Sequence, residues 1–248
     1  MRRIKIQLSY DGTDYHGWQV QPGLATIQGT LEEIISEIEG QPLQVAGSGR
    51  TDAGVHALAQ VAAFTIANPI PVENLMRAMN RLLPRDIRVT RAEEAPPEFH
   101  PRFQARAKTY EYRIFRAEIC PPFERRYVYH HPYPLCIEEM IAVAPLLEGE
   151  HDFTAFAASD ERDELPGNSK VRSIFCSRLA QESDRLIYRV TGSGFLKHMV
   201  RNIIGVLLET GKGNVDRDGV LARLEPGCAI PPGPTAPARG LFLISVEY

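Results

Sequence analysis

The sequence predicts an α+β protein made of two ferredoxin-like (βαββαβ) halves, with antiparallel sheets and a central cleft. Two patterns support this: apolar residues alternate with period two where strands are expected, and they recur at helical spacing in between. The same order of strands and helices then occurs twice along 248 residues, a length that suits two small domains. Fractions of 44% hydrophobic and 24% charged residues are those of a folded globular chain.

The first half opens with a strand over residues 3–10, in which the even-numbered side chains from Ile4 to Tyr10 share one face. A helix follows between Thr26, which can cap its start, and Gly40, which can end it. The alternation in the first segment and the helical spacing in the second give the opening β-α of the pattern.

Two short strands are expected next, over 43–46 and 58–65, with a glycine-rich loop between them. A second helix over 72–83 is stopped by Pro84, and residues 87–90 form a strand. The first half therefore has the order β-α-β-β-α-β.

The second half repeats this order with strands at 107–116, 171–179, 186–191 and 241–247 and helices at 137–147 and 197–210. Two prolines, Pro96 and Pro97, break the pattern between the halves. We place an N-terminal domain at 1–105, carrying the Asp52 loop, and a C-terminal domain at 106–248, carrying Tyr110 and Arg201. A cleft between two such sheets is a natural ligand site.

The net charge of −3 taken alone argues against a polyanionic partner, but the basic residues are 23 Arg and only 5 Lys. They are also unevenly distributed. Residues 77–126 hold 12 basic and 7 acidic residues, and residues 169–201 hold 7 and 2, so each block carries +5. This segregation predicts a basic surface for a polyanionic partner and binding that weakens with salt.

The cysteines predict neither a metal site nor a disulfide framework, because Cys120, Cys136, Cys176 and Cys228 include no C-x-x-C pair. The N-terminus has no apolar signal-peptide core. The uncharged stretch 53–72 contains Gln60 and two prolines, so we expect a strand and a turn there and no membrane span. We expect a cytoplasmic protein without metal or membrane partners.

The loop 47–56 is the most informative segment, with glycines at three of its first eight positions. A dinucleotide fingerprint would need glycine where Asp52 stands, and the Walker ending is absent. What remains is a charged pair, Arg50 and Asp52. Asp52 is either a turn aspartate that bonds its own backbone ahead of Gly54, or an ionised carboxylate beside an arginine that can act as a nucleophile.

Tyr110 and Tyr112 share one face of their expected strand with Lys108 and Ile114. Aromatic and basic groups interleaved on a sheet can stack unpaired bases, although tyrosines also favour strands for packing alone. In the later helix, Lys197 and Arg201 lie one turn apart near the positive N-terminus. They are either solvated or, for Arg201, paired with a carboxylate from elsewhere.

Three segments together resemble the tRNA pseudouridine synthase A family: residues 49–56 (GRTDAGVH), the Tyr110-x-Tyr112 strand and residues 195–202 (FLKHMVRN). Shorter matches lie at 10–12, 15–19, 83–87, 99–103 and 152–156. All occur in family order, so the resemblance covers nearly the whole chain, and its first motif is highly specific.

The resemblance implies isomerisation of uridine to pseudouridine at positions 38, 39 and 40 of the tRNA anticodon stem-loop, without a cofactor. It implies that Asp52 is the nucleophile, that Tyr110 stacks on the target base and that Arg201 pairs with the aspartate. It also implies a homodimer in which one tRNA touches both subunits. Pro101 and Ala157 depart from the usual family residues, which leaves the Asp52 assignment untouched.

The chemistry fits a single carboxylate, because a hydrolase would need a second one to activate water. Stacking on Tyr110, worth roughly 1 to 3 kcal/mol, can offset the cost of flipping the uridine out of its stem. From its charge and position, Arg50 is a candidate to steer the flipped nucleotide. Two other classes stay open: a non-catalytic RNA-binding module, and a hydrolase that uses Asp11, Asp14 or Asp52.

Overall fold

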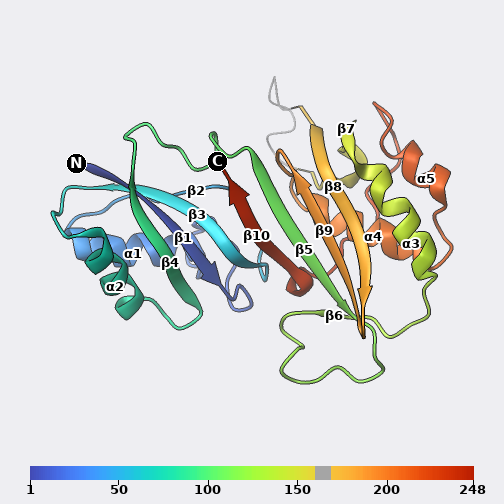
Figure 1. The fold of residues 1–248 in the computed structure, drawn as a ribbon, viewed down its shortest axis with the longest axis horizontal. Coiled ribbons are helices and arrows are strands. Elements are labelled where there is room, and N and C mark those ends of the chain that lie inside the picture. The colour runs from blue at the N-terminus through green and yellow to red at the C-terminus, as the bar shows by residue number, and fades with distance from the viewer. Residues whose placement is uncertain (160–168) are drawn as a thin grey trace. The chain divides into compact units, whose positions relative to one another are not determined.

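The computed structural model describes residues 1–159 and 169–248, and its contacts divide the chain into two compact units (Figure 1). The first unit comprises Met1–Arg106 with Phe242–Tyr248, and the second comprises Ala107–Leu241. Each unit contains both helices and strands. The predicted α+β class is therefore confirmed.

The first unit contains β1 (Arg2–Tyr10), α1 (Ile27–Glu39), β2 (Ala46–Gly47), β3 (His56–Ile66), α2 (Val72–Leu82), β4 (Ile87–Ala95) and most of β10 (Leu241–Glu247). β1 is antiparallel to both β3 and β4, and β2 is antiparallel to β3. Because β1 already occupies one edge of β3, β2 pairs with the opposite edge. β1 and β2 thus run parallel on either side of β3, and β3 and β4 run parallel on either side of β1.

Local sequence determines the core of the first unit. β1 alternates between buried and partly exposed residues, as its period-two pattern predicts. α1 buries the apolar stripe Ile27, Leu31, Ile34 and Ile35, and it contacts α2 (Figure 1). The expected helix ends are confirmed: the side chain of Thr26 accepts the amide of Gly29, and Gly40 ends the helix at φ 81°.

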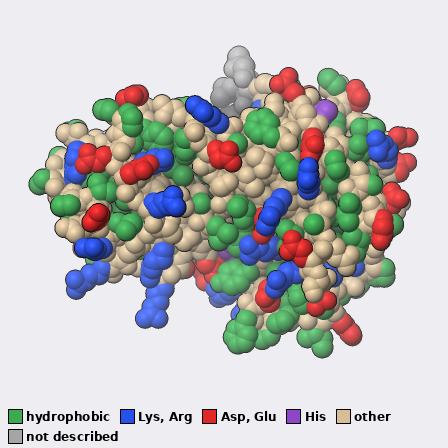
Figure 2. All heavy atoms as spheres, viewed as in Figure 1, with side chains coloured by type: hydrophobic (Ala, Val, Ile, Leu, Met, Phe, Trp, Pro, Cys, Tyr) green, Lys and Arg blue, Asp and Glu red, His purple; other side chains and the backbone are tan. Residues whose placement is uncertain are grey.

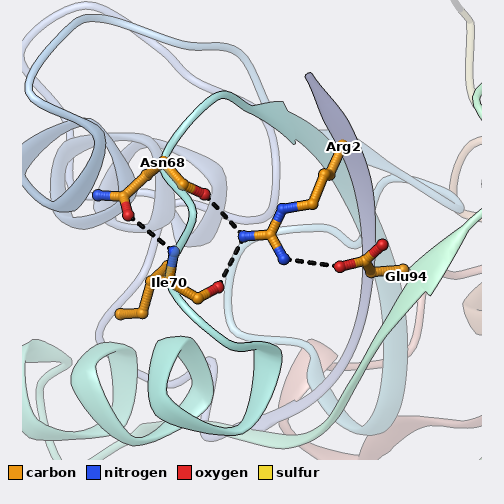
Figure 3. A network of polar contacts seen from close by, with 4 residues as sticks. All are labelled: Arg2, Asn68, Ile70 and Glu94. Carbon is orange, nitrogen blue, oxygen red and sulfur yellow. Dashed lines mark hydrogen bonds and ion pairs between the residues drawn. The ribbon is translucent and has the colours of Figure 1, made fainter.

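Arg2 fastens the start of β1 to two other segments (Figure 3). Its guanidinium donates to the carbonyl oxygens of Asn68 and Ile70 at 2.7 and 2.6 Å and to a carboxylate oxygen of Glu94 at 2.6 Å. The Asn68 side chain in turn accepts the amide of Ile70 at 2.9 Å. One arginine therefore joins β1, β4 and the turn that precedes α2.

The second unit contains β5 (Ala107–Phe115), β6 (Tyr129–His130), α3 (Ile137–Val143), β7 (Gly149–Asp152), β8 (Val171–Glu182), β9 (Arg185–Gly192), α4 (Met199–Gly211) and α5 (Arg217–Ala222). β9 lies between β5 and β8 and is antiparallel to both, and β7 extends the sheet beyond β8. The core face carries Tyr112 and Tyr188, which are cross-strand partners and fully buried. α3 contacts both α4 and β8.

Several expected boundaries differ from the observed ones. The strand expected at 43–46 is only the two residues of β2. The helix expected at 137–147 becomes 3-10 from Ala144 onward, where Pro145 cannot donate a backbone amide to the α-helical ladder. α5, capped by the side chain of Asp216, was not expected, because six residues are too few for a clear periodic signal.

The last strand, expected at the end of the second half, pairs in parallel with β3. Phe242 lies opposite His56 in this pairing, and their rings stack with centroids 4.7 Å apart. Residues 242–248 accordingly group with the first unit. Local patterning cannot reveal such a pairing, because its two strands are about 180 residues apart in sequence.

Within residues 1–159 and 169–248, no helix combines the length and the apolar character needed to cross a membrane.

Glu111 lies on the face of β5 opposite Tyr110 and Tyr112, and it is largely buried at 5% exposure. It accepts hydrogen bonds from Arg113 at 2.8 Å and from Arg189, its cross-strand partner, at 2.6 Å. Burial alone would raise the pKa of Glu111, but the two arginines outweigh it and lower the pKa below its ordinary value of 4.5.

We predict that Glu111→Gln weakens the acid sensitivity of the fold. A carboxylate whose pKa is lower in the folded than in the unfolded protein stabilises the folded state at pH values above its unfolded-state pKa. This contribution is lost as the pH falls through the pKa of the folded state. The free energy of unfolding, measured by urea denaturation at pH 7 and pH 4, should fall less on acidification in the variant than in the unsubstituted protein. Glu118→Gln, at an exposed site, is the control, and an equal acid response in all three proteins would contradict the prediction.

Candidate functional site

Asp52 lies in the loop between β2 and β3, where its side chain is half-buried, and Arg50 in the same loop is exposed. The backbone carbonyl of Asp52 accepts the amide of Val55 at 3.1 Å, which closes a turn. Gly54 occupies the left-handed region of that turn at φ 76°, a conformation that glycine adopts without strain. The turn thus fixes the backbone on the C-terminal side of the carboxylate.

The segment 10–18, which follows β1, holds this loop by backbone hydrogen bonds on both sides of Asp52. The amide of Trp18 donates to the carbonyl of Thr51 at 3.0 Å, and the amide of Gly54 donates to the carbonyl of Tyr15 at 3.3 Å. Residues immediately before and shortly after the carboxylate are therefore anchored to one neighbouring segment.

Two glycines make this close approach possible. A Cβ on Gly12 would overlap the carbonyl oxygen of Val55, and one on Gly17 would come within 2.6 Å of the carbonyl oxygen of Thr51. Gly17 also has φ 89°, so its conformation suits glycine for a second reason. At the start of the loop, a Cβ on Gly47 would come within 2.5 Å of the Trp18 indole.

A network of buried polar side chains supports the loop that carries Asp52. Tyr10 Oη lies 2.9 Å from Thr51 Oγ1, and Gln60 donates from Nε2 to the carbonyl of Gly49 at 3.1 Å. Gln60 Oε1 accepts the hydroxyl of Ser48 at 2.5 Å. Burial raises the pKa of Tyr10 to about 12, against the opposing effect of its hydrogen bonds, so the phenol is neutral at physiological pH.

His56 is buried at 1% exposure, and its Nδ1 lies 3.1 Å from both the amide of Gly12 and a carboxylate oxygen of Asp11. Nδ1 can accept from Gly12 or, when protonated, donate to Asp11, and either bond holds the segment 10–18 against β3. Asp11 also accepts the amide and hydroxyl of Thr13 at 3.0 and 2.6 Å. These contacts give His56 and Asp11 evident structural roles.

The two tyrosines of β5 differ in their contacts within the second unit. Tyr112 is fully buried and donates from Oη to the carbonyl of Pro237 at 2.7 Å, and burial raises the pKa of its phenol. Tyr110 is 8% exposed, and its ring meets that of Phe195 edge to face at 5.1 Å. Tyr112 is therefore a packing residue, while Tyr110 keeps some exposed surface.

Arg201 lies in the first turn of α4 and is partly buried. Its Nε donates to the carbonyl of Ala236 at 2.7 Å, and its own carbonyl accepts the amide of Ala236 at 3.1 Å. A Cβ on Gly205, one turn further along, would overlap the carbonyl oxygen of Pro234. The segment 234–237 therefore lies directly on the helix and fixes the arginine.

The structure thus places Asp52 and Arg50 in the first unit and Tyr110 and Arg201 in the second, each on an element anchored by its own unit. Sequence reasoning did not identify the supporting network of Tyr10, Thr51 and Gln60. The one available signal was Gln60 itself, a polar residue in the middle of an otherwise apolar strand. Across residues 1–159 and 169–248, no group of three or more His, Cys, Asp or Glu side chains is arranged to hold a metal ion.

Basic side chains are distributed over both units. On the face shown in Figure 2, Lys and Arg side chains project from each unit, interspersed with acidic ones. In the second unit, Arg178 and Arg189 are cross-strand neighbours on β8 and β9, and both are exposed. Such arginines can contact phosphates.

A family model and several named relatives match this chain over most or all of its length. A family model described as tRNA pseudouridine synthase matches residues 7–104 and 143–248. A protein of Solibacter usitatus (strain Ellin6076) named tRNA pseudouridine synthase A is 66% identical over 249 residues, covering 100% of both chains. Proteins of the same name from Geotalea uraniireducens (strain Rf4) and Geobacillus sp. (strain WCH70) are 44% and 41% identical over 248 residues. They cover 100% of this chain and 100% and 98% of their own lengths.

Among solved structures, one titled "Crystal structure of the archaeal box H/ACA sRNP Nop10-Cbf5 complex" matches with a TM-score of 0.36 at 10% identity. The match covers 83% of this chain and 42% of that chain.

We predict that Gly12→Ala destabilises the first unit, because its Cβ would overlap a backbone carbonyl that cannot rotate away. Overpacking of this kind costs about 1 to 3 kcal/mol. Thermal denaturation followed by circular dichroism should show a lower Tm. Gly194→Ala is the matched control, because the nearest atoms to its added Cβ would be 3.9 Å away. Equal Tm values for the two variants would refute the steric argument.

Proposed function

Because the chain belongs to the tRNA pseudouridine synthase family, we propose that it isomerises uridines 38, 39 and 40 of the tRNA anticodon stem-loop, with Asp52 as nucleophile. The reaction class follows from the family: the protein is an isomerase that converts uridine in tRNA to pseudouridine. The observation that carries this assignment is the 66% identity to a tRNA pseudouridine synthase A over the full length of both chains.

The reaction breaks the bond between N1 of uracil and C1′ of the ribose and forms a bond between C5 and C1′. The proton on C5 leaves and N1 gains a proton, so atoms balance without water or a redox partner. A carboxylate can assist by attacking the sugar or by adding to the base. Either route needs an ionised carboxylate and a site that excludes water, since hydrolysis would leave an abasic nucleotide.

The surroundings of Asp52 support its role as that carboxylate. The side chain is half-buried, and the backbone on both sides is fixed by bonds from Trp18 to Thr51 and from Gly54 to Tyr15. A nucleophile held this way does not have to be ordered when the substrate binds. In our proposal, Arg201 pairs with this carboxylate and keeps it ionised.

Tyr110 stacks on the flipped uracil in this proposal, and Arg50 steers the flipped nucleotide. The ring of Tyr110 is braced by Phe195 at 5.1 Å, which supports a fixed stacking surface, and Arg50 is exposed beside Asp52. Arg50 can reach a phosphate without a desolvation cost comparable to that of a buried arginine.

For the architecture, we propose two ferredoxin-like halves, with domains at 1–105 and 106–248. The first unit supports this proposal. β3 lies between β1 and β2, and β1 lies between β3 and β4, so the split βαβ arrangement occurs twice. In the second unit, the antiparallel order β5, β9, β8 is the corresponding part of the pattern.

We propose that the active form is a homodimer in the cytoplasm, in which one tRNA contacts both subunits. The loop between β5 and β6 exposes two large apolar side chains, Ile119 at 80% and Phe123 at 90%. A subunit contact would remove such side chains from water. The cytoplasmic location follows from the tRNA substrate.

We predict that incubating the protein with an unmodified tRNA transcript yields pseudouridine at positions 38, 39 or 40, where the transcript has uridine. Mass-resolved mapping of the tRNA checks this. Asp52→Asn should lower the rate by about a thousandfold or more while tRNA binding persists, because the amide cannot act as the nucleophile.

Glu33→Gln, at an exposed site on α1, serves as the active control. Release of free uracil would instead identify a hydrolase, and binding without any modified uridine would identify a non-catalytic module. Near-normal turnover by Asp52→Asn would exclude this residue as the nucleophile.

We also predict different effects for two substitutions of Tyr110. Tyr110→Phe keeps the ring and should retain more activity than Tyr110→Ala, which loses a stacking contribution of about 1 to 3 kcal/mol. Single-turnover pseudouridine formation at saturating tRNA measures the difference. Equal losses in the two variants would show that the hydroxyl, and not the ring, carries the role.

A further inference from the structure

An aromatic and cationic loop at residues 100–103 has no part in the proposed chemistry. Phe103 is 76% exposed, so most of its side chain is accessible to a ligand. Its ring lies 4.3 Å from the His100 ring, centroid to centroid, with a 31° angle between their planes. The Arg102 guanidinium lies 5.8 Å from the same ring centroid. The loop thus presents an aromatic surface beside a positive charge.

The loop is internally ordered. His100 Nδ1 accepts the amides of Arg102 and Phe103 at 3.1 and 3.4 Å, which places the imidazole under the turn. The amide of Gln104 closes the turn on the carbonyl of His100 at 3.2 Å. Because these bonds fix the backbone, Phe103 loses little additional backbone freedom when a ligand binds.

The base of the loop is attached to the core of the first unit. Tyr248 donates from Oη to the carbonyl of Pro101 at 2.8 Å, and Arg3 Nε donates to the carbonyl of Phe99 at 3.1 Å. The rings of Phe99 and Tyr248 contact each other at 5.1 Å, and the Lys5 ammonium lies over both, at 5.4 and 4.9 Å. Phe103 therefore projects from a fixed base.

We propose that Phe103 is a nucleotide-stacking site, on which an unpaired base of the tRNA stacks while Arg102 contacts a neighbouring phosphate; this rests on the proposed function. Aromatic side chains beside cations are typical of surfaces that bind single-stranded nucleic acid. The neighbours of Phe103 favour RNA over a protein partner. Residues 100–106 include two arginines and no acidic residue, a composition that suits a negatively charged phosphate backbone.

The test measures equilibrium binding without turnover, using an unmodified tRNA transcript and fluorescence anisotropy. Phe103→Ala should weaken binding about fivefold or more, the loss expected when one stacked base is removed. Phe103→Leu should bind as weakly, because it keeps apolar bulk without a ring. Phe103→Trp should bind at least as tightly as the unsubstituted protein. The exposed ring makes these substitutions compatible with folding, which Tm values verify.

Salt dependence separates the two residues. Arg102→Gln should lower the slope of log Kd against log salt concentration by about 0.7 to 1, as expected when one phosphate contact is lost. Phe103→Ala should leave the slope unchanged, because stacking releases no counterions. A merely structural role for either residue predicts no such difference in slope.

Tyr133→Ala, which removes a 67% exposed ring between β6 and α3, is the control for the loss of any exposed aromatic. Unchanged tRNA affinity in Phe103→Ala, or an equal loss in Tyr133→Ala, overturns the proposal. If the unsubstituted protein binds tRNA but forms no pseudouridine, the proposed function is contradicted. The tRNA affinities of the Phe103 variants then still decide whether Phe103 is a stacking site. Weakened binding of Phe103→Ala together with normal product at saturating tRNA supports both.

Discussion

The direct contact of two backbone segments, 10–18 and 48–55, is the constraint on which the site around Asp52 depends. Carbonyl and amide groups of the two segments lie against each other, and no side chain fits between them at Gly12 or Gly17. This contact fixes the backbone that carries the carboxylate, and the buried network of Tyr10, Thr51 and Gln60 stabilises the loop. A rigid loop of this kind suits a reaction in which one group must stay aligned through two bond changes.

Much of the fold follows from local sequence. β1 and α1 carry clear periodic signals, and the ends of α1 are specified by Thr26 and Gly40. The elements that differ depend on interactions that periodicity does not encode. β10 pairs in parallel with β3, where Phe242 stacks on His56, and β2 is defined by its pairing with β3. Such contacts between distant segments become visible only once the chain is folded.

Like the fold, the candidate site could be predicted from the sequence only in part. Glycine density and the charged pair singled out the loop that carries Asp52, but the segment whose backbone holds it, residues 10–18, lies more than thirty positions earlier. Tyr110 and Tyr112 cannot be told apart by alternation, because both point to the same face of β5. Their contacts distinguish them: the hydroxyl of Tyr112 donates to the carbonyl of Pro237 and its side chain is fully buried, while Tyr110 is 8% exposed.

Trp18 gives the molecule a built-in optical reporter. It is the single tryptophan of the chain, it is 3% exposed, and its indole lies over Gly47 at the start of the Asp52 loop. Its backbone amide is bonded to the residue that precedes the carboxylate. Intrinsic fluorescence excited at the indole band therefore arises from one place, next to the loop that carries Asp52. Any rearrangement of this loop during a catalytic cycle can be followed in real time, in the unlabelled protein.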